Sequence, residues 1–327
     1  MDTRRRAADL TDTLTLGGFK AAWSLVRTLP ERLAFGLFTL AADRAHAAGG
    51  AGVDQLRANL ARIRPDLTGD RLEATVREGM RRYLRYYCAA FRLPAMSPQL
   101  VQDSVVVRGD GPIRAELAAG RPVVCFLGHL GNWDLAGAWC GRNLGHVVTV
   151  AERLQPEELF VEFLEFREGL GMTILALGDP DVFERLGEHL APGVVMPLLS
   201  DRDLTHTGVE VDLRGHRARV AAGPAALAVR HDVALFPVSM RERPRRRDGG
   251  YGLEITFHDR VVPPGEGDSA ARVQAATQAC VDAVGEAMAA HPEDWHMMQA
   301  VFVDDLDPQR LARAGGAPLR GQAGGAP

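Results

Sequence analysis

The spacing of apolar residues along the chain changes near Pro94. Before Pro94, apolar residues recur at every third or fourth position, which is the period of an α-helix with one buried face. The clearest case spans residues 70–91, where every fourth residue is apolar: Leu72, Val76, Met80, Leu84 and Cys88. We therefore predict an amphipathic helix over residues 70–91, within a helical N-terminal region.

After Pro94, short apolar runs alternate with segments of helical spacing. Strands are predicted over residues 105–108, 122–127, 146–150, 172–175, 194–199 and 233–240, and helices over residues 112–119, 156–170, 181–190 and 223–230. Residues 251–257 are predicted to add an edge strand, and residues 269–290 to form a long covering helix. This alternation predicts an α/β fold with a mostly parallel sheet and helices on both faces.

Two apolar segments, residues 14–29 and 33–42, open the chain. Neither reaches the 18 or more apolar residues that indicate a membrane-spanning helix. These segments either cap the core of the domain or lie in a membrane interface with Trp23, Phe35 and Phe38 inserted.

The net charge of −4 hides an uneven distribution. Residues 1–100 contain 16 Arg or Lys and 10 Asp or Glu, whereas residues 101–327 contain 22 and 32. A basic N-terminal third predicts attraction to an anionic surface, unless these charges are ordinary solvated side chains. No nucleic-acid module signature accompanies them, so the predicted partner is a membrane surface and not a nucleic acid. The predicted organisation is membrane-associating helices over residues 1–50, an α/β domain over residues 51–306 and a disordered tail over residues 307–327.

The motif Gly-His-Leu-Gly-Asn-Trp-Asp (residues 128–134) stands between a predicted buried strand and a segment compatible with a helix. In open α/β sheets, the chemistry lies where parallel strands end. Five residues apart on one helix, His129 and Asp134 would not share a face, so we place His129 in the turn, with Asp134 in the first helical turn folding back toward it. A carboxylate beside an imidazole fixes its tautomer, as in a catalytic triad. The alternative is a loop histidine and an acid that suits a helix N-terminus.

Several common catalytic and binding motifs are absent from the sequence. No serine lies in G-x-S-x-G, and there is neither a G-x-G-x-x-G loop nor a Walker loop, which excludes the usual hydrolase, dinucleotide and nucleoside-triphosphate fingerprints. His291 and His296 lack the H-E-x-x-H or paired-cysteine spacing of zinc sites, so no metal is predicted. With no nucleophile beside it, His129 is predicted to act as a general base on a substrate hydroxyl.

Several sequence blocks resemble, in the same order, those of the lipid A biosynthesis acyltransferase superfamily. These blocks are residues 120–134, 200–203, 208–211, 222–225 and 291–295. Within the superfamily, the sequence is most similar to the actinobacterial phosphatidylinositol mannoside acyltransferases. The His-x4-Asp spacing alone is moderately specific, whereas the order of the blocks is strongly specific.

The resemblance implies a glycerolipid-acyltransferase-like α/β domain, bound peripherally to the cytoplasmic face of the inner membrane through its apolar N-terminal surface. It also implies transfer of a long, palmitoyl-like chain from acyl-CoA to a mannose hydroxyl of a phosphatidylinositol mannoside. Acyl-CoA is then a co-substrate, and no cofactor is expected. The same chemistry on a lysophospholipid or a lipid A precursor remains open, as does a non-catalytic acyl-CoA- or lipid-binding protein.

Catalytic residues carry over from the resemblance by position. His129 matches the catalytic histidine and Asp134 its partner. A second acid near the histidine is either Asp201 or Glu210, and the sequence leaves both open. In this scheme His129 removes a proton from the sugar hydroxyl as it attacks the thioester, and Asp134 holds the imidazole ring.

Binding residues carry over in the same way. Glu152 and Arg167 match positions that line the acceptor or CoA region. CoA phosphates need cations, for which Arg167 and Arg202 are candidates unless they form structural ion pairs. The tetrahedral oxyanion needs hydrogen-bond donors, which the free amides at the start of the helix after Gly131 can supply. The predicted substrate- and CoA-binding residues are Glu152, Arg167, Arg202, Gly131, Asn132 and Trp133.

Overall fold

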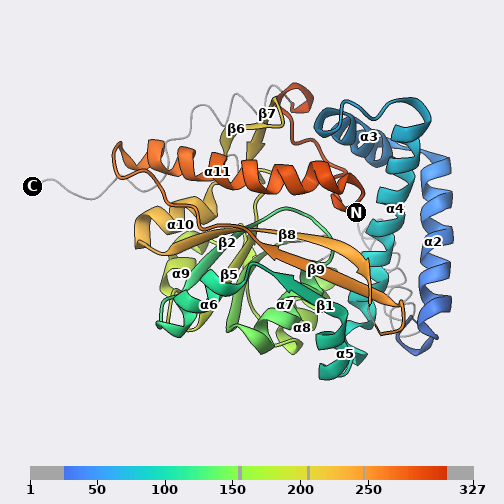
Figure 1. Ribbon diagram of the computed structural model, residues 1–327, viewed down its shortest axis with the longest axis horizontal. Helices are drawn as coiled ribbons and strands as arrows, with labels where there is room; N and C mark the ends of the chain where they lie inside the picture. Colours follow the sequence, from blue (N-terminus) through green and yellow to red (C-terminus); the bar gives the residue numbers. More distant parts are fainter. Residues whose placement is uncertain (1–25, 154–156, 205–206, 246, 308–327) are drawn as a thin grey trace, which may run out of the picture.

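The computed structural model describes residues 26–153, 157–204, 207–245 and 247–307, and Figure 1 shows their arrangement. Within these residues, seven strands form one sheet in the order β1-β9-β8-β2-β5-β3-β4. The strands of this sheet are β1 (Val105–Arg108), β2 (Val123–Leu127), β3 (His146–Glu152), β4 (Thr173–Leu177), β5 (Val194–Leu199), β8 (Ala234–Pro244) and β9 (Tyr251–Phe257).

Five strands of this sheet run in the same direction, because β2 pairs in parallel with β5 and β8, β5 with β3, and β3 with β4. β9 is antiparallel to β8, and β1 is parallel to β9, so these two strands oppose the other five. The predicted α/β fold with a mostly parallel sheet is confirmed. The prediction of an edge strand at residues 251–257 is wrong, because β1 pairs along the outer side of β9 and takes the edge itself.

The central strand β2 has all five of its residues buried. A continuous run of Val, Cys, Phe and Leu side chains is typical of a parallel strand that is covered on both faces. The neighbouring strands β5 and β8 are also buried over most of their length. Because β2 ends at Leu127, His129 lies at the carboxyl edge of the parallel strands, where α/β proteins bind their ligands.

Helices flank the sheet, and Figure 1 shows α11 along one side of it and α7 and α8 on the other. The helix α11 matches the predicted covering helix, and it begins where the Asp268 carboxylate accepts a hydrogen bond from the Ala271 amide at 2.8 Å. From Pro98 onward, the described α-helices are α5 (Pro98–Ser104), α6 (Gly111–Ala118), α7 (Trp133–Asn143), α8 (Glu157–Gly169), α9 (Val182–Glu188), α10 (Gly223–His231) and α11 (Ser269–Ala290). Three short 3-10 helices are η1 (Leu93–Ala95), η2 (Pro292–Asp294) and η3 (Val303–Asp305).

The N-terminal region contains three further described helices: α2 (Glu31–Ala48), α3 (Ala51–Ile63) and α4 (Gly69–Arg92). The amphipathic helix predicted over residues 70–91 is confirmed as α4, whose Val76 and Met80 face the core. α2 lies along α4 (Figure 1), and the Asp43 carboxylate on α2 accepts hydrogen bonds from both Arg77 and Arg81 on α4. The division of the chain at residue 50 stays a prediction.

None of the described helices is both long enough and apolar enough to cross a bilayer. Phe35 and Phe38, which the sequence offered as membrane-inserting residues, pack inward instead. The Phe35 ring stacks on Tyr251 with centroids 5.1 Å apart, and the Phe38 ring meets Phe91 edge-on at 6.4 Å. Trp23, most of the predicted helix over residues 14–29 and the predicted tail from residue 308 lie outside the described residues.

A two-stranded antiparallel hairpin, β6 (Val209–Leu213) and β7 (His216–Val220), is absent from the sequence-based prediction. Its turn places both Arg214 and Gly215 at positive φ, 59° and 85°. Two consecutive residues at positive φ are typical of the tight turns that match the twist of a hairpin. The alternation of apolar and polar residues over 209–213, followed by glycine, was the available signal.

Candidate active site

His129 and Asp201 meet because two parallel strands end side by side. β2 and β5 pair with Leu127 opposite Leu199, and the Ser200 amide continues the pairing by donating to the Leu127 carbonyl at 2.8 Å. His129 and Asp201 each lie two residues beyond these last pairs. The Nδ1 atom of His129 is 2.6 Å from Oδ1 of Asp201, and the His129 amide donates to Oδ2 at 2.9 Å.

The Asp201 carboxylate is buried and ionised. Burial alone would raise its pKa, but attraction to His129 and hydrogen bonds from His129 and Trp295 outweigh it and hold the pKa of Asp201 below its ordinary value. An ionised carboxylate accepts, so Nδ1 of His129 carries a proton, and in a neutral ring Nε2 then bears the free lone pair. Within the described residues Nε2 has no hydrogen-bond partner, and the side chain is 19% exposed.

Neither a hydrogen bond nor an ion pair joins Asp134 to His129, and the prediction that Asp134 folds back toward the imidazole is wrong. α7 begins at Trp133, and Asp134 in its first turn is buried against α4 and α8. There it accepts hydrogen bonds from the Tyr86 hydroxyl at 2.8 Å and from Nε of Arg167 at 2.7 Å. Burial, and then the charge of Asp134, raise the pKa of Tyr86, so this phenol stays protonated and donates.

The two candidates for the second acid lie in different places. Asp201 contacts His129 directly, as described. Glu210 lies on the β6–β7 hairpin and forms an ion pair with Arg217 across it. The geometry therefore gives His129 the Asp201 carboxylate and leaves Glu210 away from the imidazole.

Three predicted binding residues form ion pairs. Arg167 is mostly buried and its guanidinium binds Asp134, so it does not extend from the surface as a phosphate ligand would. Glu152, at the end of β3, and Arg202, directly after Asp201, form a pair at 2.6 Å. The structure thus brings Glu152 and Arg202 together, and their roles toward substrate stay predictions.

The segment Gly131–Trp133 shapes the turn between β2 and α7. Gly131 has φ of 59° and lies close to the backbone of Met240 and Arg241, so a side chain there would be both strained and crowded. The Asn132 side chain caps α7 by accepting from the Leu135 amide at 2.9 Å. Among the described residues, the amides of Trp133 and Asp134 have no hydrogen-bond partner, as expected for the first turn of a helix.

Trp133 forms part of an aromatic wall beside His129. Its ring lies 4.1 Å from that of Tyr86, and it meets the His129 ring nearly at right angles, with centroids 5.5 Å apart. Tyr86 also approaches the ring of His296. The Trp133 ring of α7 therefore borders the imidazole of His129, and Tyr86 of α4 packs against that ring.

The C-terminal segment Asp294–His296 lies against the His129 turn, which the sequence did not predict. The His296 amide donates to the His129 carbonyl at 2.8 Å, and the Gly131 amide donates to the Asp294 carbonyl at 3.0 Å. The His296 ring contacts the Gly131 carbonyl through Nε2 at 3.0 Å. Burial lowers the pKa of His296 to about 3, so this ring is neutral and donates to the Gly131 carbonyl.

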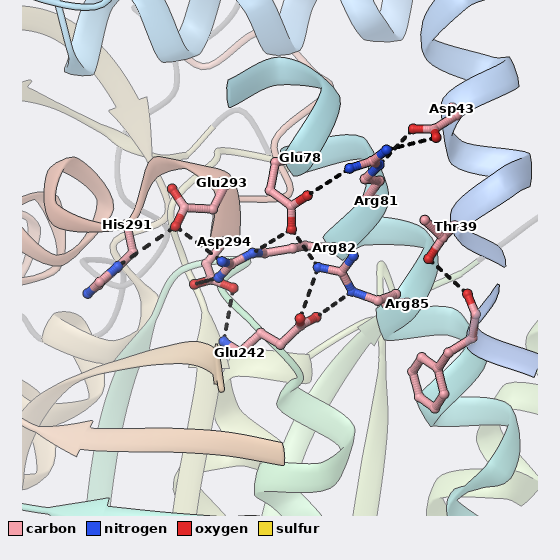
Figure 2. A network of polar contacts seen from close by, with 11 residues as sticks. Thr39, Asp43, Glu78, Arg81, Arg82, Arg85, Glu242, His291, Glu293 and Asp294 are labelled. Carbon is pink, nitrogen blue, oxygen red and sulfur yellow. Dashed lines mark hydrogen bonds and ion pairs between the residues drawn. The ribbon is translucent and has the colours of Figure 1, made fainter. Parts of the chain in front are cut away.

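Figure 2 shows the polar network that holds this segment. The Asp294 carboxylate accepts hydrogen bonds from Arg82 of α4 at 2.6 Å and from the Glu242 amide of β8 at 2.9 Å. Arg82 also pairs with Glu293, at 3.3 Å. The network therefore ties the C-terminal segment to both α4 and the sheet.

The side chains of His291, Glu293 and Asp294 lie close enough together to be considered as metal ligands. Two guanidinium groups already bind these side chains. Arg82 pairs with both acids, and Arg241 contacts Nε2 of His291. Their positive charges oppose the binding of a further cation. The expectation that the protein uses no metal stays a prediction.

Comparison with known proteins agrees with this architecture. Residues 11–303 match the model of the family described as bacterial lipid A biosynthesis acyltransferase. A protein of Mycolicibacterium smegmatis named phosphatidylinositol mannoside acyltransferase is 40% identical over 300 residues, covering 91% of this chain and 94% of that protein. A protein of the same name from Mycobacterium tuberculosis H37Rv is 38% identical over 313 residues, covering 94% of each chain. The match extends across the whole α/β sheet and the His129 turn, and the chain therefore belongs to the bacterial lipid A biosynthesis acyltransferase family.

Proposed function

We propose that this protein transfers a long-chain acyl group from acyl-CoA to a mannose hydroxyl of a phosphatidylinositol mannoside. The name of the two relatives supports the acceptor, and the family supports acyl transfer. The observation that carries the chemistry is the pair of His129 and Asp201, with Nδ1 held by a buried carboxylate and Nε2 uncommitted.

In the proposed reaction, Nε2 of His129 removes the proton from the mannose hydroxyl. The hydroxyl oxygen attacks the thioester carbon, and the carbonyl oxygen becomes an oxyanion. When this intermediate collapses, the carbon–sulfur bond breaks and the CoA thiolate takes the proton back from His129. General-base catalysis of this kind contributes on the order of 10²–10⁴ in rate. Acyl-CoA is the co-substrate, and the scheme needs no further cofactor.

Two other groups support this reaction. Asp201 holds the ring tautomer and stabilises the imidazolium that forms, as the acid of a catalytic triad does. In this proposal, the amides of Trp133 and Asp134, at the positive end of α7, donate to the oxyanion. Asp134 acts on this scheme indirectly, because its bonds to Tyr86 and Arg167 fix the first turn of α7.

We also propose that the protein binds peripherally to the cytoplasmic face of the inner membrane through α2. Leu33, Leu37 and Leu40 lie three and four residues apart on this helix and are 51%, 50% and 48% exposed. That spacing gathers them into one apolar stripe, which we call the α2 leucine stripe. Arg32 and Arg44, also exposed, lie near its two ends and favour anionic headgroups. A lipid acceptor must be collected from a membrane surface, which agrees with such a stripe.

The transfer reaction is tested with purified protein, radiolabelled palmitoyl-CoA and a phosphatidylinositol mannoside, with His129→Ala as the control. We expect labelled product from the wild type and a loss of at least a hundredfold in the variant. Equal rates would contradict the role of His129. If product formed only with a lysophospholipid or a lipid A precursor, the proposed acceptor would be wrong and that lipid would take its place. Binding of acyl-CoA without turnover of any acceptor would identify a non-catalytic protein.

A further inference from the structure

Trp295 contacts Asp201, the acid of the proposed active site. Its indole Nε1–H donates to Oδ2 of Asp201 at 2.8 Å, and the residue is completely buried. The same Oδ2 accepts the His129 amide, while Oδ1 binds the imidazole. The indole is therefore one of three donors that together fix both oxygens of a single carboxylate.

We propose that Trp295 is a positioning residue for acyl transfer. It orients the Asp201 carboxylate and stabilises its negative charge, and Asp201 in turn holds the imidazole of His129 in position. This inference rests on the proposed function. Trp295 touches neither substrate nor the reacting nitrogen in this scheme, so its effect passes entirely through the carboxylate.

The backbone around Trp295 also fits this role. Leu130 and Trp295 form an isolated antiparallel bridge, and the flanking residues bond to the same turn through the Gly131 amide and the His129 carbonyl. The indole is thus placed by the same segment that fixes the histidine turn. A displacement of this segment would move the carboxylate and the imidazole together.

Few other groups near Asp201 could replace the indole as a hydrogen-bond donor to its carboxylate. The titratable groups on the turn side include His129, the neutral His296 and Asp294, and Arg202 pairs with Glu152. From α11, the closest side chains at Gly128 are Val284 and Met288, which carry no charge. Without the indole N–H, part of the negative charge on Asp201 loses its stabilisation, and the carboxylate becomes a stronger partner for the protonated imidazole.

Trp139 offers a matched control within the same protein. It lies in α7 and is almost completely buried, like Trp295. Its Nε1, however, has no hydrogen-bond partner among the described residues. Replacing either tryptophan by phenylalanine removes a similar buried volume, but only Trp295→Phe removes a donor from Asp201.

The test compares Trp295→Phe and Trp139→Phe in the full-length protein by their rates of acyl transfer at several pH values. We expect kcat of Trp295→Phe to fall roughly tenfold relative to Trp139→Phe, with KM changed less than about twofold, because Asp201 loses one of the three donors that fix its orientation toward the imidazole. We also expect the acidic limb of the pH–rate profile to move to higher pH in Trp295→Phe alone. Identical kcat values and pH profiles in the two variants would overturn the inference.

Two further measurements keep this test decisive. Benzothienylalanine at position 295 replaces the N–H by sulfur at nearly constant volume, so the test stands even if Trp295→Phe does not fold. In ¹⁵N-tryptophan spectra, the Trp295 indole signal is expected to move on Asp201→Asn while the Trp139 signal stays in place. This spectral change is measured without substrate, so it does not depend on transferase activity. A wild type without transferase activity would refute the proposed function and leave the hydrogen bond testable. A Trp295 signal that does not move on Asp201→Asn would refute the inference.

Discussion

Two of the buried aspartates next to the His129 turn, Asp201 and Asp134, differ in the partners of their carboxylates. Asp201 follows β5 and faces a histidine and an indole, whereas Asp134 begins α7 and faces an arginine and a phenol. A histidine gains and releases protons near neutral pH, but an arginine does not. The carboxylate that can take part in proton transfer is therefore Asp201, and the carboxylate of Asp134 stabilises the helix that carries the proposed oxyanion donors.

The largest effect is expected from Asp201→Asn. The amide keeps the size of the side chain but presents a donor as well as an acceptor to His129, which favours the wrong tautomer. By analogy with catalytic triads, we expect kcat to fall roughly 10³–10⁴-fold with little change in melting temperature. Steady-state kinetics and thermal unfolding measure this, and a fall of less than about tenfold would contradict the assignment.

Asp134→Asn is expected to act mainly on stability. It leaves the Arg167 guanidinium buried without its counter-charge, so we expect the free energy of unfolding to fall by about 3 kcal/mol in urea titrations. The matched control is Glu152→Gln, which breaks an ion pair whose acid is 46% exposed and is expected to cost less than about 1 kcal/mol. Similar losses in both variants would show that the Asp134 pair is not a buried anchor.

His296 is expected to make the His129 turn sensitive to acid. The pKa of His296 is about 3 in the folded protein, whereas an unfolded histidine has a pKa near 6.5. Between these two pH values the unfolded chain binds a proton at His296 that the folded chain does not bind. The free energy of unfolding should therefore fall as pH drops from about 6.5, by up to about 1.4 kcal/mol per pH unit. Unfolding of His296→Gln should depend less steeply on pH, whereas the exposed control His231→Gln should keep the wild-type slope.

The smallest expected effect concerns the α2 leucine stripe. Replacing Leu33, Leu37 and Leu40 by serine removes half-exposed apolar side chains, so we expect binding to anionic vesicles to weaken about tenfold in sedimentation assays. Transfer to a soluble, short-chain acceptor should be unaffected. The control replaces Val161 and Val262, which are exposed apolar residues outside α2. If vesicle binding weakened equally in the control, the proposal that the α2 leucine stripe binds the membrane would be contradicted.

The sequence predicted those features that depend on neighbours along the chain. The apolar run of β2 and the apolar residues at every fourth position of α4 are local patterns, and each formed the expected element. The choice of acid for His129 depends instead on which strands are adjacent. The sequence predicts Asp134 because it is five residues from His129, whereas Asp201 reaches the histidine only because β5 pairs beside β2.

The same reason explains why the C-terminal segment was missed. Trp295 contacts Asp201 across 94 residues of sequence, and His296 contacts Gly131 across 165. No periodicity in one sequence encodes such contacts, although the block at residues 291–295 was recognisable as part of the resemblance. The prediction that residues 251–257 form an edge strand is wrong for the same reason, since the pattern of a strand does not state its neighbours.

The most direct test of the roles of these acids is the protonation of the His129 ring, read from ¹⁵N chemical shifts of histidine-labelled protein. The proton is expected on Nδ1 in the wild type and in Asp134→Asn, and the Nδ1 signal is expected to change in Asp201→Asn. His129→Gln assigns the signal by removing it. A wild-type ring protonated on Nε2, or a signal that responds to Asp134→Asn and not to Asp201→Asn, would contradict the pairing of His129 with Asp201.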